Sequence, residues 1–408
     1  MSTLTSNATK RQQFRQLSVL IGLNFVDMLG FAMVFPLLPF YALKLNATPE
    51  MVGVLMSSYS VAQLVAAPVW GRVSDRYGRR PALLIGLTAS ALAFLVFGLA
   101  TSLWVLFLSR VVQGAGGGTT GVAQAYVSDT VAKEDRAQAL GWLSAATNAG
   151  ISIGPAIGSL AAHLGRAAPG YFAAGLCFIN VLAAWRWLPE TRTAEQRAAA
   201  PPQRKPLWHA AYEVVAHPFG TRERLIWIYG IGMFAFSLLT GVLALWLGAR
   251  FAITEKTIGW YFVYYGLLSF VVRLFFLGPV VKKFGEVGTM RLGTLLLAAG
   301  MLMYPLATSI WMMAFIIPFV PIGTALLFPA TTSLLSHSTE PGALGTTMGV
   351  AQTFAGVARI AAPVLGGIAF QRIGISAPFT IGGITVLMVA WVAFRHIRPV
   401  VSAEHAVT

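Results

Sequence analysis

The chain has 408 residues, of which 56% are hydrophobic and only 11% are charged. A soluble domain carries about 25% charged residues, so this composition excludes a soluble globular protein. The net charge is +15, and the positions of the basic residues decide whether it indicates nucleic-acid binding. The single cysteine, Cys177, excludes an internal disulfide and a cysteine metal cluster.

The apolar residues form blocks of about twenty, the length of a helix that crosses the ~30 Å hydrocarbon core of a membrane. The first block follows a basic N-terminal stretch and continues to Tyr41, which is too long for a signal peptide. The sequence therefore predicts an all-α polytopic membrane protein. In chain order its twelve predicted spans are 17–43, 50–70, 82–101, 103–130, 137–163, 169–188, 224–249, 257–279, 289–308, 310–335, 343–370 and 375–397.

The basic residues are distributed unequally between the two sides of these spans. If the N-terminus lies inside, and residues at span ends are counted with the adjoining side, 21 Lys and Arg residues fall on the cytoplasmic side and five fall outside. The other three, Arg110, Arg273 and Arg359, lie within spans. Such an excess is the positive-inside rule. It predicts a protein of the cell inner (plasma) membrane with both termini in the cytoplasm, and it explains the basic charge by topology, with no nucleic-acid partner.

The longest polar segment, 189–220, divides the spans into six and six. It contains the run "AAAPPQRKP", a composition typical of a flexible linker. We expect an N-terminal half at 1–188, a cytoplasmic linker at 189–220 and a C-terminal half at 221–408. Within the linker, 207–217 has the Trp and Tyr pattern of a short helix lying on the membrane surface.

The halves resemble distant copies of one another. The stretch "GRVSDRYGRRP" at 71–81 has a counterpart "GPVVKKFGEVG" at 278–288, and "GISIGPAIG" at 150–158 has a counterpart "ARIAAPVLG" at 358–366. A third pair is "TPEMVG" at 48–53 and "TEKTIG" at 254–259. Three matches in register predict two pseudo-symmetric six-helix halves, an arrangement in which substrate sites lie near the midplane.

Several motifs resemble one known family. "GRVSDRYGRRP" between spans two and three is similar to the loop signature of the major facilitator superfamily, and "RVVQGAGGG" from Arg110 is similar to its fourth-helix motif. "GISIGPAIG" and "NFVDMLGFAMVFPLLP" resemble the fifth and first helices of the twelve-helix drug:proton antiporters of the tetracycline-exporter group. That group typically carries an acid in the third helix, but 82–101 has none, so tetracycline itself is not predicted as the substrate.

The charged loop at 71–81 is a candidate cytoplasmic gate. Arginines there enforce topology, but topology gives no reason for Asp75 or for glycines at 71 and 78. The family resemblance implies that Asp75 faces the N-terminus of span eleven and that Arg79 pairs with Asp129. The alternative is that the loop serves topology alone. The gate residues that we predict are Gly71, Asp75, Gly78, Arg79, Arg80 and Asp129.

Asp27 is the only acidic residue well inside a predicted span. It lies about ten residues into span one, so ~15 Å deep, where an ionised carboxylate is costly and usually marks a proton or substrate path. Arg110 lies near the same depth in span four, and we predict that the two residues act together in proton coupling. The alternative is a carboxyl that stays protonated and bonds a backbone carbonyl.

Small residues at Gly150, Gly154 and Gly158, with Pro155 between them, predict a helix-packing seam. We also expect this seam to seal the two halves on the external side. Arg273 lies near the inner end of span eight, and we expect its side chain to extend to the membrane surface. Arg359 lies deeper in span eleven, and the alternatives for it are cavity lining or a bond to helix ends. The residues that we predict as possible cavity lining are Asn24, Phe31, Tyr59, Gln63, Gln113, Gln124, Tyr264 and Arg359, with Gln113 and Gln124 on one helical face.

These observations predict proton-coupled efflux of amphipathic small molecules by alternating access, in a protein that functions as a monomer. No phosphate-binding loop and no metal-ligand spacing occur in the sequence, so we expect no enzyme activity, no cofactor and no metal. One alternative is a proton-coupled transporter of a specific metabolite such as a sugar or a siderophore. A channel or receptor is the other, although neither needs a gate or a deep acid.

Overall fold

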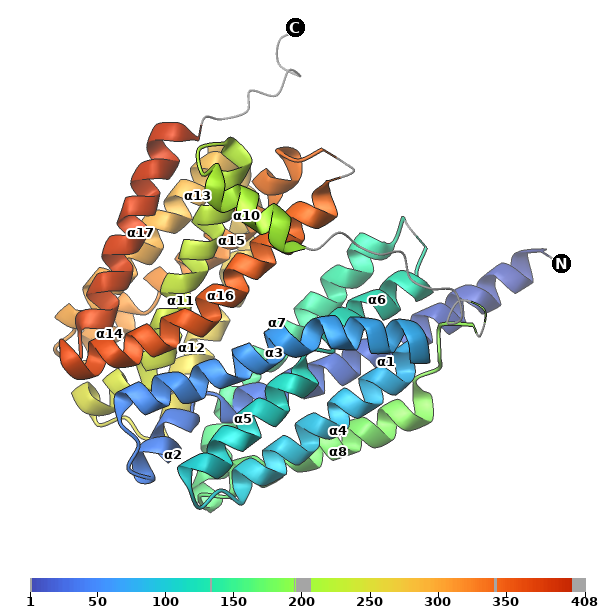
Figure 1. The fold of residues 1–408 in the computed structure, drawn as a ribbon, viewed down its shortest axis with the longest axis horizontal. Coiled ribbons are helices and arrows are strands. Elements are labelled where there is room, and N and C mark those ends of the chain that lie inside the picture. The colour runs from blue at the N-terminus through green and yellow to red at the C-terminus, as the bar shows by residue number, and fades with distance from the viewer. Residues whose placement is uncertain (1, 133, 194, 196–206, 341–342, 398–408) are drawn as a thin grey trace, which may run out of the picture. The chain divides into compact units, whose positions relative to one another are not determined.

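The structure is a computed structural model, and it describes residues 2–132, 134–193, 195, 207–340 and 343–397. Within these residues every regular element is a helix and no strand forms (Figure 1). The all-helical prediction is therefore confirmed. The predicted linker lies partly outside the described residues, at 194 and 196–206. The short helix predicted within it is present as α10 (Leu207–Ala216), and its place on the membrane surface stays a prediction.

The helices before the linker follow the predicted apolar runs. They are α1 (Ser2–Val34), α2 (Leu38–Lys44), α3 (Pro49–Tyr77), α4 (Arg79–Gly98), α5 (Leu103–Gly117), α6 (Thr120–Thr130), α7 (Arg136–Ala161), a 3₁₀ turn (Ala162–Leu164) and α8 (Ala168–Trp187).

The helices after α10 also follow the predicted apolar runs. They are α11 (Thr221–Phe251), α12 (Ile258–Val271), a π-helical segment (Val272–Phe276), α13 (Leu277–Met303), a 3₁₀ turn (Tyr304–Leu306), α14 (Ile310–Ile316), α15 (Phe319–His337), α16 (Leu344–Arg372) and α17 (Ala377–His396).

Nine helical stretches of the described chain are long and apolar enough to cross a membrane. One of them, Ile258–Leu306, has 49 residues and covers two predicted spans. α12, the π segment and α13 follow one another without a loop, but the backbone turns within α13 at Gly285, whose φ of 68° and ψ of 173° are not helical. Predicted span 103–130 is divided into α5 and α6 at Gly118 and Thr119. The chain is thus a multi-pass membrane protein, while the number of twelve spans stays a prediction.

The chain divides into two compact units. The first unit is Met1–Gln203 with Ala252–Val263, and the second is Arg204–Phe251 with Tyr264–Thr408. The predicted halves at 1–188 and 221–408 remain a prediction. The short segment 252–263 lies after α11 in the chain but packs with the first unit.

Every backbone position with a positive φ angle in the described residues has a counterpart about 207 residues away. The pairs are Asn46 (φ 61°) with Ala252 (φ 54°), Gly78 (φ 113°) with Gly285 (φ 68°), and Gly165 (φ 132°) with Gly374 (φ 150°). Left-handed conformations are uncommon and mark specific turns. Ser102 and Ser309, also 207 positions apart, each cap a helix with a side-chain oxygen. Related repeats would produce this pairing.

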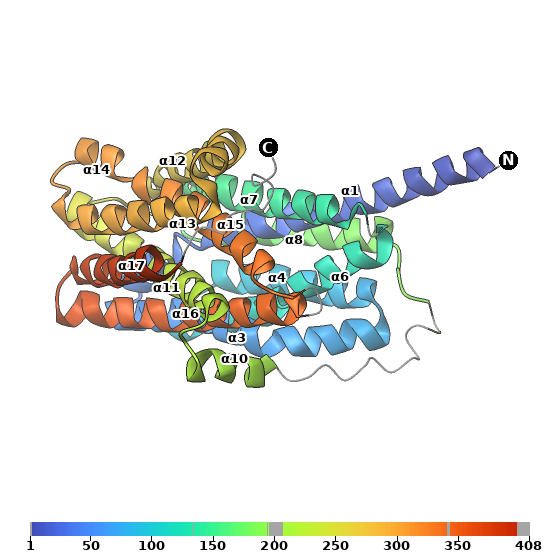
Figure 2. The same cartoon turned by 90° about the horizontal axis from the view of Figure 1, so that it is seen from above.

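In the first unit α7 packs along α1, and α8 packs on α1 as well (Figure 2). The predicted seam glycines make the α7 contact close: a Cβ at Gly150 would lie 2.7 Å from the Phe25 carbonyl oxygen, and one at Gly154 would lie 2.7 Å from that of Leu29. Gly158 faces Met33 in the same way. The stripe is therefore explained by packing inside one unit, and its sealing role stays a prediction.

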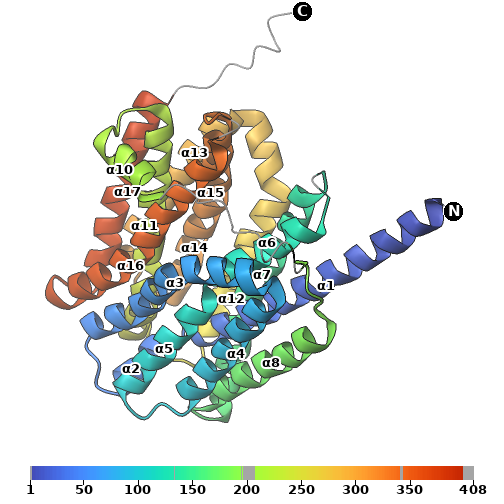
Figure 3. The ribbon, with the colours of Figure 1, turned by 45° about the vertical axis from the view of Figure 1, so that its right-hand side comes forward.

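The same pairing recurs in the second unit, where α16 packs along α11 (Figure 3). There a Cβ at Gly241 of α11 would lie 2.9 Å from Pro363 Cβ of α16. Figure 3 also shows α4 beside α5 and α8 in the first unit.

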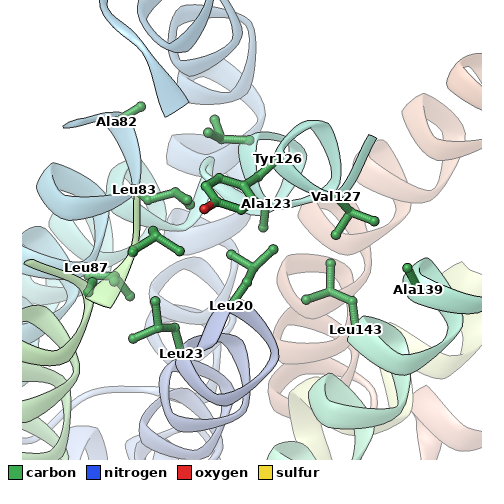
Figure 4. Packing of buried hydrophobic residues seen from close by; sticks show 13 residues of the cluster. Leu20, Leu23, Ala82, Leu83, Leu87, Ala123, Tyr126, Val127, Ala139 and Leu143 are labelled. Atoms are coloured by element: carbon green, nitrogen blue, oxygen red, sulfur yellow. The ribbon is translucent and has the colours of Figure 1, made fainter. Parts of the chain in front are cut away.

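A buried apolar cluster joins α1, α4, α6 and α7 at one end of the first unit (Figure 4). Leu20 of α1 and Tyr126 of α6 are 2% and 0% exposed, and Leu83, Leu87 and Leu143 surround them. This cluster fixes the segment of α1 that leads to Asp27.

Candidate functional site

Asp27 lies on α1 one turn after Leu23 of the apolar cluster, toward the C-terminal end of the helix, and is partly exposed. The buried Ser90 hydroxyl of α4 donates a hydrogen bond to its carboxyl group. A small cavity of about 30 Å³ lies beside it. The cavity is lined by Leu20, Leu23, Asn24, Asp27, Leu83, Leu87, Thr119, Thr120 and Ala123. The deep acid that the sequence singles out therefore borders a cavity that also contains polar groups.

Asn24 lies one turn before Asp27 and lines the same cavity, as predicted. Its amide nitrogen donates hydrogen bonds to Thr147 Oγ1 at 2.6 Å and to the Leu143 carbonyl oxygen at 3.3 Å. Both partners belong to α7. Asn24 thus ties the polar segment of α1 to α7 by hydrogen bonds in an otherwise apolar contact.

Arg110 lies on α5 and is 1% exposed. No ion pair joins it to Asp27 in the described residues. Its guanidinium carbon lies 5.6 Å from the centre of the Phe97 ring, and its Nε and Nη2 atoms have no hydrogen-bond partner in the described part of the chain. Arg110 therefore keeps N–H donors that have no partner in the described residues. Such incomplete pairing of a buried cation is costly.

Three of the predicted cavity residues form one contact group on α1 and α3. The Phe31 and Tyr59 rings are 5.1 Å apart. Gln63 Nε2 donates to the Tyr59 hydroxyl and to the Gly117 carbonyl oxygen, both at 3.2 Å. Because Gly117 is the last residue of α5, this group packs against the end of that helix.

The two glutamines predicted to line the cavity from span four lie on different helices and differ in burial. Gln113 is buried on α5 at 3% exposure, with its Oε1 atom unpaired in the described part of the chain, whereas Gln124 is exposed on α6. The break at Gly118 and Thr119 interrupts the helix between them. The prediction of one continuous helical face is therefore wrong, because it assumed an unbroken helix from 103 to 130.

The remaining two predicted cavity residues are in the second unit. The Tyr264 hydroxyl of α12 donates to the Ala314 carbonyl oxygen at 3.1 Å, and Arg359 of α16 is exposed. Neither lines a described cavity.

A much larger cavity, of about 570 Å³, lies within the second unit between α10, α11 and α16. Its lining carries no charged side chain and consists of Ala211, Tyr212, Val215, Trp227, Gly230, Ile231, Phe234, Thr353, Phe354, Val357, Ala358 and Ala361. The Trp227 and Phe354 rings meet edge to face at 5.0 Å. Its volume is in the range of small-molecule sites. Sequence reasoning missed it, because apolar residues on membrane helices carry no pattern that separates a cavity wall from a lipid-facing or packed surface.

The charged stretch 71–81 forms a network at the junction of α3 and α4. α3 continues through Tyr77, so the predicted turn is reduced to Gly78. Arg79 Nη1 lies 2.9 Å from Asp75 Oδ1, and Arg79 Nε lies 2.9 Å from Asp129 Oδ2. The Arg79–Asp129 pair that the resemblance implied is thus formed. Arg79 also donates to Ser74 Oγ at 2.7 Å and is 6% exposed.

Two residues of this network were missed. Glu190 accepts hydrogen bonds from the backbone N–H groups of Arg79 (2.9 Å) and Arg80 (3.2 Å), the first residues of α4. A carboxylate there satisfies unpaired N–H groups and faces the positive end of the helix dipole. Arg192 bonds Asp75 through its side chain at 3.2 Å. Both follow α8, more than 100 positions along the chain, and no local pattern reveals such a contact.

Gly78 is required at this junction for two reasons. Its φ of 113° lies in the left-handed region, and a Cβ there would collide with the Glu190 carboxylate. Gly71, by contrast, has no neighbouring atom within 4 Å of a Cβ position, so close packing gives no reason for a glycine there. Arg80 donates from Nη2 to the Trp185 carbonyl oxygen of α8.

The segment Ala252–Thr257, which we call the α11–α12 strap, was not predicted as a site. Glu255 forms an ion pair with Lys44 at the end of α2. Ser159 Oγ of α7 donates to the Glu255 carbonyl oxygen at 2.9 Å and accepts from the Gly259 N–H at 2.8 Å. Burial favours the neutral acid, but the Lys44 hydrogen bond and the charges of Lys44 and Lys256 outweigh it and lower the pKa of Glu255 below its usual 4.5.

The family model of the Major Facilitator Superfamily matches residues 20–240 and 225–407. The chain belongs to this superfamily. Because the matches cover nearly the whole chain, the predicted family is confirmed, and the protein is a membrane transporter.

Several curated relatives of this superfamily member extend over most of the chain. The class B tetracycline resistance protein of Escherichia coli is 25% identical over 91% of this chain and 92% of its own. The class C protein of the same organism is 29% identical over 86% and 88%. Multidrug resistance protein 2 of Bacillus subtilis is 26% identical over 91% and 92%.

Solved transporter structures share the fold at low identity. The human organic anion transporter MFSD10 has a TM-score of 0.69 and 23% identity, with 93% of this chain and 99% of that chain covered. The nucleoside transporter NupG has a TM-score of 0.74 and 14% identity over 94% and 99%. At these identities the likeness shows the fold alone.

Proposed function

We propose that this transporter exports apolar or amphipathic small molecules in exchange for protons. The observation that carries the proposal is Asp27, an acid in α1 that accepts from Ser90 and borders a cavity in which Asn24, Thr119 and Thr120 are also polar. Acids at such positions in membrane helices are rare and mark proton or substrate paths. The relatives named for tetracycline and multidrug resistance support export of small molecules.

The proposed architecture is twelve spans in two six-helix halves, with both termini in the cytoplasm of an inner-membrane protein that functions as a monomer. The paired left-handed positions and the paired serine caps support two repeats. The excess of basic residues on one side of the spans supports the orientation.

The large cavity of the second unit supports an apolar ligand. Its walls carry four aromatic side chains and no charge. A sugar would need several polar partners in such a site, so this cavity favours an aromatic or amphipathic molecule over the metabolite alternative.

The coupling that we propose uses two states of Asp27. In one state the carboxyl is protonated and bonds Ser90, and Arg110 stays over Phe97. In the other, the ionised carboxylate attracts Arg110, whose Nε and Nη2 atoms have unused donors. Release of the proton and release of the small molecule are then linked, because the same carboxylate cannot be both protonated and ion-paired. The network around Arg79 is the proposed cytoplasmic gate.

The test uses everted membrane vesicles from a pump-deficient host that expresses the chain. An imposed pH gradient, acid inside, should drive uptake of the fluorescent dyes ethidium or Hoechst 33342, and the uptake should stop when a protonophore removes the gradient. A panel of sugars and siderophores tested in parallel should give no gradient-driven uptake. Uptake of a panel metabolite but of neither dye would favour the metabolite transporter instead.

A further inference from the structure

The small cavity beside Asp27 is polar where it meets the break between α5 and α6. Thr119 and Thr120 lie at this break and line the cavity opposite α1. Thr119 is 8% exposed, whereas Thr120 is an exposed residue. The cavity therefore extends from the carboxyl group of Asp27 to a residue at the surface of the described structure.

The polar groups around the cavity have acceptor capacity left. The Thr119 and Thr120 hydroxyls each donate to a carbonyl three residues earlier, Gly116 and Gly117, both at 3.1 Å. Each hydroxyl oxygen therefore keeps lone pairs that can accept. Asn24 uses its amide nitrogen on α7, and its amide oxygen remains an acceptor. What the site lacks is a molecule with two donors.

Water fits this requirement. The volume of about 30 Å³ is sufficient for at least one water molecule, and a buried water needs two to four polar partners. Here one O–H can be donated to Asp27 and the other to Asn24 or a threonine. We propose that this cavity holds a water molecule that hydrogen-bonds Asp27 and donates to one of the acceptors Asn24, Thr119 and Thr120 at a time, and that this water relays the proton between Asp27 and the Thr120 end of the cavity.

The relay conserves atoms and charge. When Asp27 releases its proton, the O–H bond of the carboxyl breaks and a new O–H bond forms on the water. At the same time the water passes one of its own protons to the Thr120 hydroxyl oxygen, and the Thr120 O–H bond breaks as its proton leaves the Gly117 carbonyl and passes to solvent water, so that the hydroxyl is re-formed. Loading of Asp27 is the reverse. Cys177 of α8 is a titratable group close to Asp27, but it is fully buried and lies outside the cavity lining.

A sodium ion is the competing occupant, since all four groups offer oxygen. Sodium needs more oxygen ligands than these four side chains supply. The residues Gly116 and Gly117, whose carbonyls accept from the threonine hydroxyls, do not line the cavity. We therefore propose water as the occupant, and the test below separates it from sodium.

The test uses purified full-length protein and infrared difference spectroscopy during a pH titration. The difference between wild type and Asp27→Asn identifies the Asp27 carboxyl band. In H₂¹⁸O, wild type should show a water O–H band that shifts with the isotope and changes together with that carboxyl band. Ala123→Val, which places two methyl groups at the cavity wall, should remove the water band. Ala139→Val is the matched control, because Ala139 belongs to the same buried cluster but does not line the cavity.

A kinetic arm tests the relay itself. After a pH jump, the Thr119→Val/Thr120→Val protein should protonate Asp27 roughly tenfold more slowly than wild type, which corresponds to about 1.4 kcal/mol. The serine double variant should restore the rate because it keeps both hydroxyls. Thr88→Val on α4 is the control, since its hydroxyl also bonds only its own helix.

The inference rests on the proposed proton coupling, and the outcomes separate the two. No isotope-sensitive band in wild type, or an unchanged band in Ala123→Val, would overturn the water site. A response of the Asp27 band to sodium at constant pH would assign the cavity to the ion and also overturn it. A normal water signature together with full gradient-driven dye transport by Asp27→Asn would leave the site standing and refute the proposed function.

Discussion

The two cavities lie on matching positions of α1 and α11 but have opposite chemistry. Leu20, Leu23, Asn24 and Asp27 line the small cavity, and Trp227, Gly230, Ile231 and Phe234, each 207 residues later, line the large one. Two of the four residues in the first unit, Asn24 and Asp27, have polar side chains. The four residues in the second unit are two aromatic residues, one isoleucine and one glycine. If the two units are repeats, as we propose, the same helix face occurs twice, and its side chains include a carboxyl group in the first unit and form an apolar wall in the second.

The largest expected effect comes from Asp27→Asn. The amide has nearly the shape of the acid but cannot exchange a proton, so dye uptake driven by an imposed pH gradient should be abolished. Downhill exchange of preloaded dye should continue, because binding in the second unit is intact. The control is Asp135→Asn, which changes an exposed acid before α7. Undiminished uphill uptake by Asp27→Asn would show that Asp27 does not carry the proton, and the two cavities would then not differ in proton binding.

Phe234→Ala tests the other side of the comparison. It removes an aromatic wall of the large cavity, so the apparent affinity for Hoechst 33342 should fall by about 10-fold to 100-fold, or roughly 1.4–3 kcal/mol. The proton dependence should be unchanged. Phe315→Ala is the control, since Phe315 is 79% exposed and outside the cavity. Equal affinities in both variants would mean that the dye binds elsewhere.

The turns at Gly78 and Gly285 also differ between the two units in the charged residues beside them. Arg79 is buried between two carboxylates, whereas Lys282 in the matching stretch forms no ion pair in the described residues. Arg79→Gln leaves Asp75 and Asp129 without their shared cation, which should lower the stability by about 2 kcal/mol. Lys282→Gln should leave it unchanged. Thermal unfolding in detergent measures both, and a similar small loss in each would show that Arg79 serves topology alone.

The strap gives a pH-dependent prediction. Because the pKa of Glu255 is lowered in the folded protein, its ionised form adds stability above pH 4.5, and this contribution is lost as the pH falls through the lowered pKa. Glu255→Gln should therefore lower the melting temperature at pH 7 by roughly a degree or two. The difference should shrink as the pH falls below 4.5 and vanish once the pH is below the lowered pKa of Glu255. A difference that persists in acid would assign the effect to packing instead of charge. Glu213→Gln, on α10, is the control.

The smallest expected effect is at Ala252. Its counterpart Asn46 tolerates the left-handed conformation, but an alanine there is strained. Ala252→Asn should raise the stability by less than about 1 kcal/mol, measured by thermal unfolding in detergent. Ala244→Asn, at a helical and buried position of α11, is the opposite case and should destabilise the protein. No gain in Ala252→Asn would mean that the two turns differ in conformation.

Local sequence predicted most of the helices, since apolar length and glycine or proline positions are read directly from the chain. It also singled out Asp27, and the family resemblance gave the Arg79–Asp129 pair. It did not predict Glu190, which bonds Arg79 across 111 positions, or Glu255, which meets Lys44 across 211. Those contacts depend on which helices pack together, and a single charged residue at a helix end carries no signal of its partner. The helix break before Thr120 was missed because small residues there are equally compatible with an unbroken packed helix.

The contact between α1 and α7 has a mechanical consequence. A Cβ at Gly150 or Gly154 would overlap the backbone of α1, so the two helices are interlocked at main-chain distance and cannot slide past one another without separating. Asn24 adds hydrogen bonds across the same contact. We therefore expect α1 and α7 to move together during transport. Motion that changes access to the carboxyl group is then expected from the α4 and α5–α6 side, where the cavity and the helix break lie.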